Sequence, residues 1–367
     1  MGQNQLTTPP PILGTAQIRL LEKLCHACAV SGDEGEVRKI VLDQIRPYVD
    51  ELRVDAMGNV LAVRRGKDAS RMKVMLAAHM DEVGFMLTSD DDSNEGIYRF
   101  EIVGGIDPRY LTGKVIQINR QNAKGVIGCK PIHLTSADER KNALTVEALR
   151  VDMGGSGGKA KIGDRGTFAP FFHRQGDRFY AKALDDRLGV ATLIEILKQD
   201  FPHLDILAAF TVQEEVGLRG AQVAAYALNP DAALVLDCTH AYDLPLDSRD
   251  EFYPQENTRY NARLGHGPAI YLADRVTIYD PRWIAHLVQT AEETGIPYQF
   301  RQPGIGGTDA GAIHKQRTGI PTVSVSVPGR YLHTPITIAS LNDWENTIKL
   351  VHAALLRLTP AVFLPER

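Results

Sequence analysis

Two adjacent acids, Glu214 and Glu215, follow an apolar segment, residues 206–212, that predicts a buried strand. Charged side chains directly after such a strand cost free energy unless a ligand or partner uses them. One carboxylate of the pair can hold a cation while the other moves a proton. Because a Glu-Glu pair in a solvated loop is the plain alternative, the interpretation depends on the residues that accompany the pair.

Four further side chains of metal-binding types lie just beyond other predicted strands: His79 and Asp81 after residues 73–78, Asp237 after residues 233–236, and His333 after residues 322–327. A lone histidine is usually structural. A His and an Asp two positions apart at a strand end are better explained as a ligand and the carboxylate that orients it.

Asp185 and Asp186 open a predicted helix that runs to about Lys198. Either can be the N-cap, and the pair leaves one carboxylate for a second role. The ends of neighbouring parallel strands share one edge of a doubly wound sheet, so the acids and histidines can converge there. Two imidazoles and three carboxylates suit zinc, cobalt or manganese. One bridging carboxylate lets them serve two ions and leaves Glu214 free.

The composition is that of an ordinary globular protein, and 367 residues suffice for two domains. A net charge of -4 gives no electrostatic footprint for nucleic acid or an anionic membrane. No apolar run is long enough to span a bilayer, and the polar residues 1–15 predict a flexible tail without a secretory signal, so a cytoplasmic location is expected. The four cysteines indicate no disulfide framework, and Cys25 and Cys28 are interpreted as packing residues.

The local patterns predict an α/β chain interrupted by a β-rich insert. Residues 16–84 and 171–367 carry the long apolar strands and amphipathic helices of the catalytic domain, whereas residues 85–170 contain short strands between Gly, Pro and Asp turns. Within the larger domain, residues 52–64 predict a hairpin. Ser31 and Glu34 predict a capping box at the start of a helix.

The sequence closely resembles the M42 peptidase family, whose best-known members are the tetrahedral aminopeptidases. Seven segments in family order carry the resemblance: residues 78–84 (AHMDEVG), 128–133 (GCKPIH), 162–168 (IGDRGTF), 182–187 (KALDDR), 212–217 (VQEEVG), 306–309 (GGTD) and 330–335 (RYLHTP). The resemblance implies a zinc-peptidase α/β/α domain with a small β-barrel or PDZ-like insert that takes part in oligomerisation.

The resemblance also implies two divalent ions per chain, zinc or cobalt with manganese possible. One ion is assigned to His79, Asp237 and a bridging Asp185. The other is assigned to Asp185, Glu215 and His333. These roles make the chain a dinuclear-metal aminopeptidase acting on short peptides. Family members usually assemble into hollow dodecamers, and a dimer is the expected building block.

The remaining roles come from the same resemblance. Glu214 is assigned as the general base that serves a metal-activated water, and Asp81 as the residue that orients a metal-bound histidine. Gly307, Thr308 and Asp309 form a backbone-exposing loop and are predicted to bind substrate.

Two alternatives remain open. The enzyme could be a specialised amide hydrolase or deacylase for one small peptide or acylated amino acid, and a non-catalytic relative that keeps the site as a scaffold is the second. The long tail and the polar residues 247–260 depart from the family pattern. Arg249, Arg259 and Arg301 could favour acidic substrates, although surface solvation is the usual role of arginine.

Overall fold

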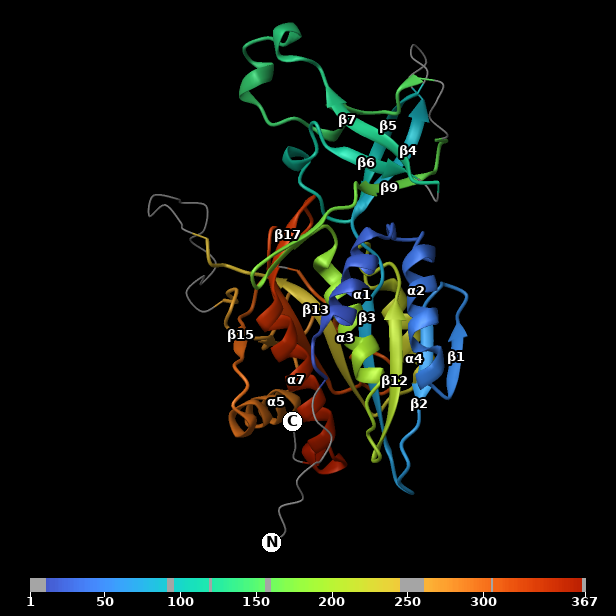
Figure 1. Ribbon diagram of the computed structural model, residues 1–367, viewed down its shortest axis with the longest axis vertical. Helices are drawn as coiled ribbons and strands as arrows, with labels where there is room; N and C mark the ends of the chain where they lie inside the picture. Colours follow the sequence, from blue (N-terminus) through green and yellow to red (C-terminus); the bar gives the residue numbers. More distant parts are fainter. Residues whose placement is uncertain are drawn as a thin grey trace.

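The computed structural model shows a sheet covered by helices, with a smaller barrel at one end of the molecule (Figure 1). The structure describes residues 11–90, 96–118, 121–155, 160–244, 261–304 and 306–364. Most of the predicted tail and the polar segment 247–260 lie outside these ranges. The α/β fold with a small barrel insert, as predicted, is confirmed.

The main sheet has eleven strands within the described ranges, and the order β1-β2-β12-β3-β13-β16-β17-β11-β10 is extended by β14 and β15. The strands are β1 (Glu51–Val54), β2 (Val60–Arg64), β3 (Met72–His79), β10 (Phe172–Gln175), β11 (Arg178–Ala181), β12 (Leu204–Thr211), β13 (Ala232–His240), β14 (Ala269–Tyr271), β15 (Gln299–Arg301), β16 (Thr322–Arg330) and β17 (Thr337–Ser340). The predicted hairpin is the antiparallel pair β1 and β2.

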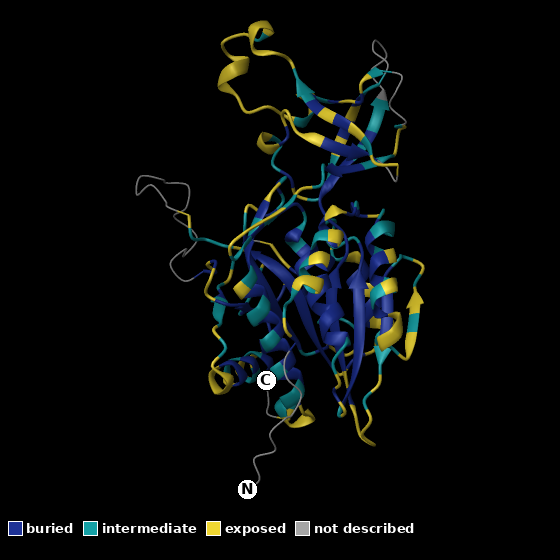
Figure 2. Cartoon of the chain, in the orientation of Figure 1, coloured by how far each residue is buried: buried dark blue, intermediate teal, exposed yellow. Residues whose placement is uncertain are grey.

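Four central strands run parallel, with β3 between β12 and β13 and with β16 beside β13. They are buried almost throughout their lengths, as the dark blue centre of Figure 2 shows. Burial on both faces explains why their sequences are nearly continuous apolar runs, not alternating patterns. Their carboxyl ends therefore define one edge of the sheet.

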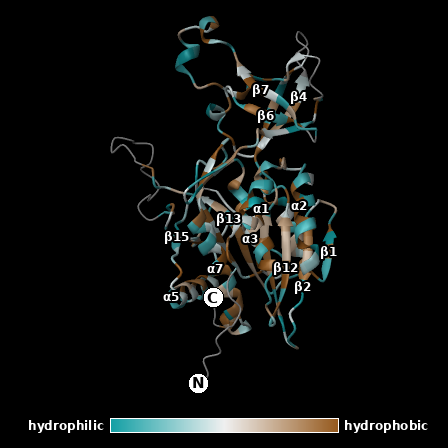
Figure 3. Cartoon of the chain, in the orientation of Figure 1, coloured by the Kyte–Doolittle hydropathy of each residue, from teal (hydrophilic) through white to brown (hydrophobic). Residues whose placement is uncertain are grey.

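Helices cover both faces of the sheet: α1 (Thr15–His26), α2 (Gly35–Ile45), α3 (Leu184–Leu197), α4 (Arg219–Leu228), α5 (Pro281–Thr294), α6 (Ala310–Ile313) and α7 (Leu341–Arg357). The larger core lies beneath α1, α2, α3, α5 and α7 and contains Trp283 and Trp344. A second core, beneath α4 and α6, is rich in alanine, which lets these helices approach the sheet closely. The buried apolar residues accordingly belong to the central strands and to the helices that cover them, where brown is frequent in Figure 3.

The barrel is closed in the order β4-β5-β8-β7-β6-β9. Its strands are β4 (Gly84–Asp90), β5 (Ile97–Val103), β6 (Val115–Ile118), β7 (Ala123–Cys129), β8 (Leu149–Asp152) and β9 (Arg165–Phe168). Phe85 packs edge-to-face against Phe100 and Phe168, at centroid distances of 5.5 and 5.3 Å. A separate core of this kind lets a small unit hold its shape beside the main domain.

One predicted helix start is wrong. Glu34, not Ser31, is the N-cap residue of α2, and no side chain caps that helix end. Ser31 instead donates its hydroxyl hydrogen to Asp81 Oδ2 at 2.6 Å, and Glu34 Oε1 accepts from the Gly32 backbone N–H at 2.6 Å. Asp81 is fully buried, so a hydrogen-bond donor is worth more there than at a helix end.

Glu82 forms a buried ionic centre between the two domains. Its carboxylate accepts from Lys182 Nζ at 2.7 and 2.8 Å, from Arg187 Nη2 at 2.9 Å and from the Thr167 hydroxyl at 2.8 Å. Thr167 belongs to β9 of the barrel, whereas Arg187 belongs to α3. All four side chains are buried, so this carboxylate joins the barrel to the main domain through contacts that water does not screen.

We predict that Glu82→Gln lowers the free energy of unfolding by about 3–5 kcal/mol, because two buried cations lose their carboxylate. Glu51→Gln is the control, since Glu51 pairs with Arg65 at the surface and its side chain is 58% exposed. The control should change stability by at most about 1 kcal/mol. Urea unfolding at fixed protein and metal concentrations measures both. Equal losses would contradict a stabilising role for the buried centre.

Candidate active site

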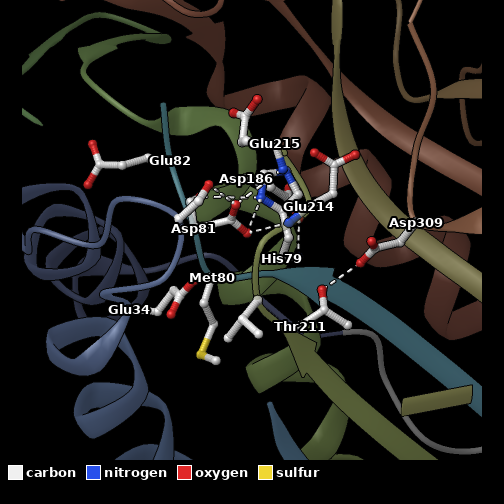
Figure 4. A network of polar contacts seen from close by, with 12 residues as sticks. Glu34, His79, Met80, Asp81, Glu82, Asp186, Thr211, Glu214, Glu215 and Asp309 are labelled. Carbon is white, nitrogen blue, oxygen red and sulfur yellow. Dashed lines mark hydrogen bonds and ion pairs between the residues drawn. The ribbon is translucent and has the colours of Figure 1, made fainter. Parts of the chain in front are cut away.

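The ends of the parallel strands bring the predicted ligand residues together. His79 is the last residue of β3 and pairs with Thr211, the last residue of β12, so Glu214 and Glu215 follow beside it. Asp237 lies two residues beyond Val235, which pairs with Ala77 of β3. Figure 4 shows His79, Glu214 and Glu215 gathered at this edge.

The first group consists of His79, Asp185 and Asp237, each of which offers one ligand atom within 4.8 Å of the other two. The Nε2 atom of His79 lies 3.2 Å from Asp185 Oδ1 and 3.8 Å from Asp237 Oδ1. His79 and Asp237 are buried. One imidazole nitrogen and two carboxylate oxygens thus face a common point.

The second group consists of Asp185, Glu215 and His333, again within 4.8 Å of one another. The Nε2 atom of His333 lies 3.4 Å from Asp185 Oδ2 and 3.4 Å from Glu215 Oε2. Asp185 therefore belongs to both groups, with Oδ1 near one imidazole and Oδ2 near the other. The structure brings all five predicted ligands together, and their role as ligands stays a prediction.

Neither aspartate is the N-cap residue of α3, which is Ala183, but Asp186 bonds to a backbone N–H just after the non-helical residues 185 and 186. Its Oδ1 accepts from the Gly189 backbone N–H at 2.9 Å, and its Oδ2 accepts from the His79 backbone N–H at 3.2 Å. Asp185, Asp186 and Cys238 form a third possible cation group. Both carboxylate oxygens of Asp186 in this group already accept hydrogen bonds from backbone N–H groups. The Cys238 thiol also donates to the Leu184 carbonyl at 3.1 Å. Asp185 is left to face the histidines.

Asp81 lies behind His79 and is fully buried. Its carboxylate accepts from the backbone N–H groups of Glu214 and Glu215 at 3.0 and 3.2 Å, and its Oδ1 lies 3.5 Å from His79 Nδ1. The Asp81 backbone oxygen also lies 3.2 Å from that nitrogen. Asp81 thus links the end of β3 to the Glu-Glu pair, which agrees with the orienting role predicted for it.

The electrostatics of the site are dominated by buried acids. Burial raises the pKa of Glu215 from 4.5 to about 7, against the effect of His333, and raises that of Asp237 from 3.8 to about 6. Burial also raises the pKa of Glu214 well above its ordinary value, although His79 opposes this. These buried carboxylates therefore favour the binding of a cation, either a proton or a metal ion.

The histidines show the complementary effect. Burial would lower the pKa of His79, but hydrogen bonds to Asp185 and Asp237 outweigh it and raise that pKa well above its usual range. Burial likewise opposes protonation of His333, yet Glu215 and Asp185 raise its pKa to about 10. The carboxylates that favour imidazolium here would equally favour a metal cation that replaces its proton.

A cavity of about 790 Å³ opens directly onto both groups, and its lining includes Glu214 and Gly307. The other two residues predicted to bind substrate are buried beside it. The Thr308 hydroxyl lies 3.1 Å from the Tyr279 hydroxyl, and Asp309 Oδ2 accepts from the Thr211 hydroxyl. Thr308 and Asp309 are thus held by buried hydrogen bonds, and of the three residues Gly307 lines the cavity, while their role in substrate binding stays a prediction.

Several lining residues were missed at the sequence level, among them Gly105, His240, Tyr271 and Arg275. His240 ends strand β13 and so carried the same strand-end signal as the ligands, whereas no pattern marked Gly105. Interpreting Arg301 as a surface residue is wrong. It is 3% exposed, lines the cavity and donates to Asn261 Oδ1 at 3.0 Å. Arg249 and Arg259 lie outside the described residues.

Comparison with known proteins shows which family the whole chain resembles. Residues 58–350 match the model of the family described as M42 glutamyl aminopeptidase. The lysyl aminopeptidase of Pyrococcus furiosus is 33% identical over 359 residues, which cover 94% of this chain and 99% of that protein. Sequence similarity thus extends over nearly all of both chains.

Two solved structures are similar along almost their whole length. A TET aminopeptidase from a marine sediment archaeon of the Thaumarchaeota has a TM-score of 0.86 at 32% identity, covering 95% of this chain and 98% of that one. The TET1 peptidase of Pyrococcus horikoshii, which can assemble into a tetrahedron or a large octahedral shell, has a TM-score of 0.80 at 32% identity, covering 93% and 100%. The chain therefore belongs to the M42 aminopeptidase family, whose members hydrolyse peptides.

Proposed function

We propose that this chain is a two-metal aminopeptidase that removes N-terminal residues from short peptides, with Glu214 as its general base. The observation that carries the proposal is the position of Asp185. Its two carboxylate oxygens lie 3.2 and 3.4 Å from the ring nitrogens of His79 and His333. A carboxylate shared between two His-containing groups is suited to bridging two ions.

The donor atoms fit divalent transition metals. Each group offers one imidazole nitrogen and two carboxylate oxygens, a set that suits zinc, cobalt or manganese better than calcium. His79, Asp185 and Asp237 would hold one ion, and Asp185, Glu215 and His333 the other. Ions bound there would polarise the scissile carbonyl and lower the pKa of water.

Glu214 is the residue best placed to move protons. Both glutamates line the cavity, but Glu215 lies 3.4 Å from His333 and belongs to the second group of candidate ligands, which leaves Glu214 free. The backbone N–H of Glu214 donates to Asp81, which fixes this segment of the chain. The side-chain carboxylate of Glu214 is not used in that bond and lies at the cavity. Glu214 takes the proton of the attacking water and returns it to the leaving amine. Its raised pKa brings its basicity toward the working range of such a catalyst.

The proposal includes a closed homo-oligomer of twelve chains built from dimers, with the active sites facing inward. The insert offers suitable surface for contacts between the chains. Phe100, Ile106 and Leu111 are buried in the barrel core, whereas Ile132 and Leu134 are 69% and 61% exposed. Exposed apolar side chains of this kind mark contact surfaces.

No helix within the described ranges is both long and apolar enough to cross a membrane. The cytoplasmic location expected from the sequence stays a prediction.

Glu214→Gln should reduce turnover of aminoacyl p-nitroanilides by about two to four orders of magnitude while both metal ions remain bound, because an amide cannot accept the proton. Glu215→Gln is the matched comparison and should lose metal instead. Elemental analysis and steady-state rates, with zinc or cobalt added, separate the two effects. Near-normal turnover of fully loaded Glu214→Gln would show that another group is the base.

Metal should stabilise the protein more as the pH rises. Glu215 and Asp237 have native pKa values of about 7 and 6, above their ordinary values of 4.5 and 3.8. The metal-free native state therefore binds more protons than the unfolded state between about pH 4 and 7, so it loses stability as pH increases through that window. Bound metal replaces these protons.

The melting temperatures of metal-free and zinc-loaded protein, measured from pH 5 to 8, test this expectation. The difference between the two melting temperatures should widen with pH in the wild type. In Glu215→Gln the difference should be smaller and should widen less. Glu293→Gln, an exposed acid on α5, is the control and should leave the difference unchanged. A difference that stays constant across the range would contradict the assignment of these acids as ligands.

Ile132→Asp should shift the assembly to smaller species without loss of bound metal, because the charge would have to be buried in a subunit contact. Light scattering coupled to size exclusion should give about twelve times the chain mass of 40.4 kDa for the wild type. Ile278→Asp, which alters an apolar residue that is 75% exposed on the main domain, is the comparison. A fully active wild-type monomer with both metals bound would refute the assembly.

A further inference from the structure

His333 has an uncommon backbone conformation, with φ at 59°. Residues other than glycine keep this left-handed conformation where surrounding contacts compensate for it. One such contact is a hydrogen bond of 2.8 Å between Nδ1 of His333 and the backbone carbonyl of Gly105. Because a carbonyl can only accept, Nδ1 carries the hydrogen. Nε2 faces Asp185 and Glu215 and is therefore the nitrogen that a metal ion would bind in place of its proton.

The two histidines of the site are supported by different parts of the chain. The Nδ1 atom of His79 lies 3.2 Å from the backbone oxygen of Asp81, only two residues away in the same segment. Gly105, by contrast, lies two residues beyond the barrel strand β5 and 228 residues from His333 in sequence. The ring of His333 is therefore supported directly from the barrel, whereas the ring of His79 is supported from its own segment.

The turn formed by Gly104 and Gly105 fits closely against the second group. A Cβ atom on Gly105 would lie 3.3 Å from His333 Nδ1. A Cβ atom on Gly104 would lie 2.8 Å from a methyl group of Val83 and 3.3 Å from the Cβ of Glu215. The turn thus lies against His333 and Glu215, two of the three residues of that group. A side chain in place of either glycine would intrude on the space that these residues occupy.

The barrel itself is held firmly enough to fix this turn. Val103, just before the turn, pairs with Gly84, where a Cβ atom would lie 2.4 Å from the Gly166 carbonyl oxygen. The Thr167 hydroxyl donates to the buried Glu82 carboxylate at 2.8 Å. The strand that leads into the turn is therefore closely packed within the barrel, and the barrel is bonded to the main domain near the same point.

We propose that the inserted barrel is a positioning element of the active site, and that the Gly105 carbonyl orients His333 and so sets the affinity of the group formed by Asp185, Glu215 and His333. The inference rests on the proposed two-metal function. It predicts that a change in this turn weakens one metal site and spares the other.

Calorimetric titration of metal-free, full-length protein with Co²⁺, followed also by visible absorption, tests the proposal. Gly105→Val should weaken one of two binding events by about 10- to 100-fold, the usual effect of losing a residue that supports a metal-binding histidine. Gly105→Ala, the milder change, should weaken the same event by a smaller factor. Gly128→Val is the control, because Gly128 lies in β7 of the same barrel and a Cβ atom there meets nothing within 4 Å.

His333→Ala and His79→Ala identify the two events. The event weakened by Gly105→Val should be the one that His333→Ala removes, and adding Gly105→Val to His333→Ala should cause no further loss. Equal weakening of both events, or weakening of neither by both glycine variants, overturns the proposal and leaves the two-metal function standing. Fewer than two binding events in the wild type overturns the proposed function itself, and this inference with it.

Discussion

The shared carboxylate of Asp185 is the constraint on which the site depends. Its two oxygens lie close to the imidazoles of His79 and His333. The neighbouring Asp186 takes the hydrogen bonds to the Gly189 and His79 backbones, so Asp185 is left to face the two histidines. Glu214, Glu215 and Asp237 surround this point with further desolvated acids. Such a set is costly as anions alone, and cations between the carboxylates would relieve that cost.

The sheet and the barrel supply different parts of this arrangement. Parallel pairing of β3, β12 and β13 places His79, the Glu-Glu pair and Asp237 at one edge, because strands in register end together. The barrel contributes no predicted ligand, yet it contacts the site through Gly105 and is joined to the main domain through Glu82. The insert therefore contacts the active site, in addition to the assembly role proposed for it.

The candidate site was largely predictable from sequence, because each ligand type stood at the end of an apolar run or beside a helix start. What the sequence could not supply were contacts between distant backbones. The Gly105 carbonyl has no side chain that could signal its role, and Ser31 looked like a helix cap because local pattern does not show that Asp81 is buried nearby. Arg301 was misjudged for the same reason, since its burial depends on tertiary packing around Asn261.

The barrel was predictable as a β-rich segment from its short apolar runs and turns, but its closure was not. Closure buries Phe100, Ile106 and Leu111 in the barrel core. Strand pairing between distant segments decides that outcome, and alternation within one strand does not encode it. Among the described residues of the insert, the two most exposed apolar side chains, Ile132 and Leu134, lie in the connection between β7 and β8.

Anomalous diffraction from crystals grown with zinc or cobalt tests the central claim most directly, because it locates each ion without reference to activity. The account predicts two peaks on either side of the Asp185 carboxylate, one beside His79 and Asp237 and the other beside Glu215 and His333. A single peak at saturating metal, or a peak between Asp186 and Cys238 in place of either, would contradict it.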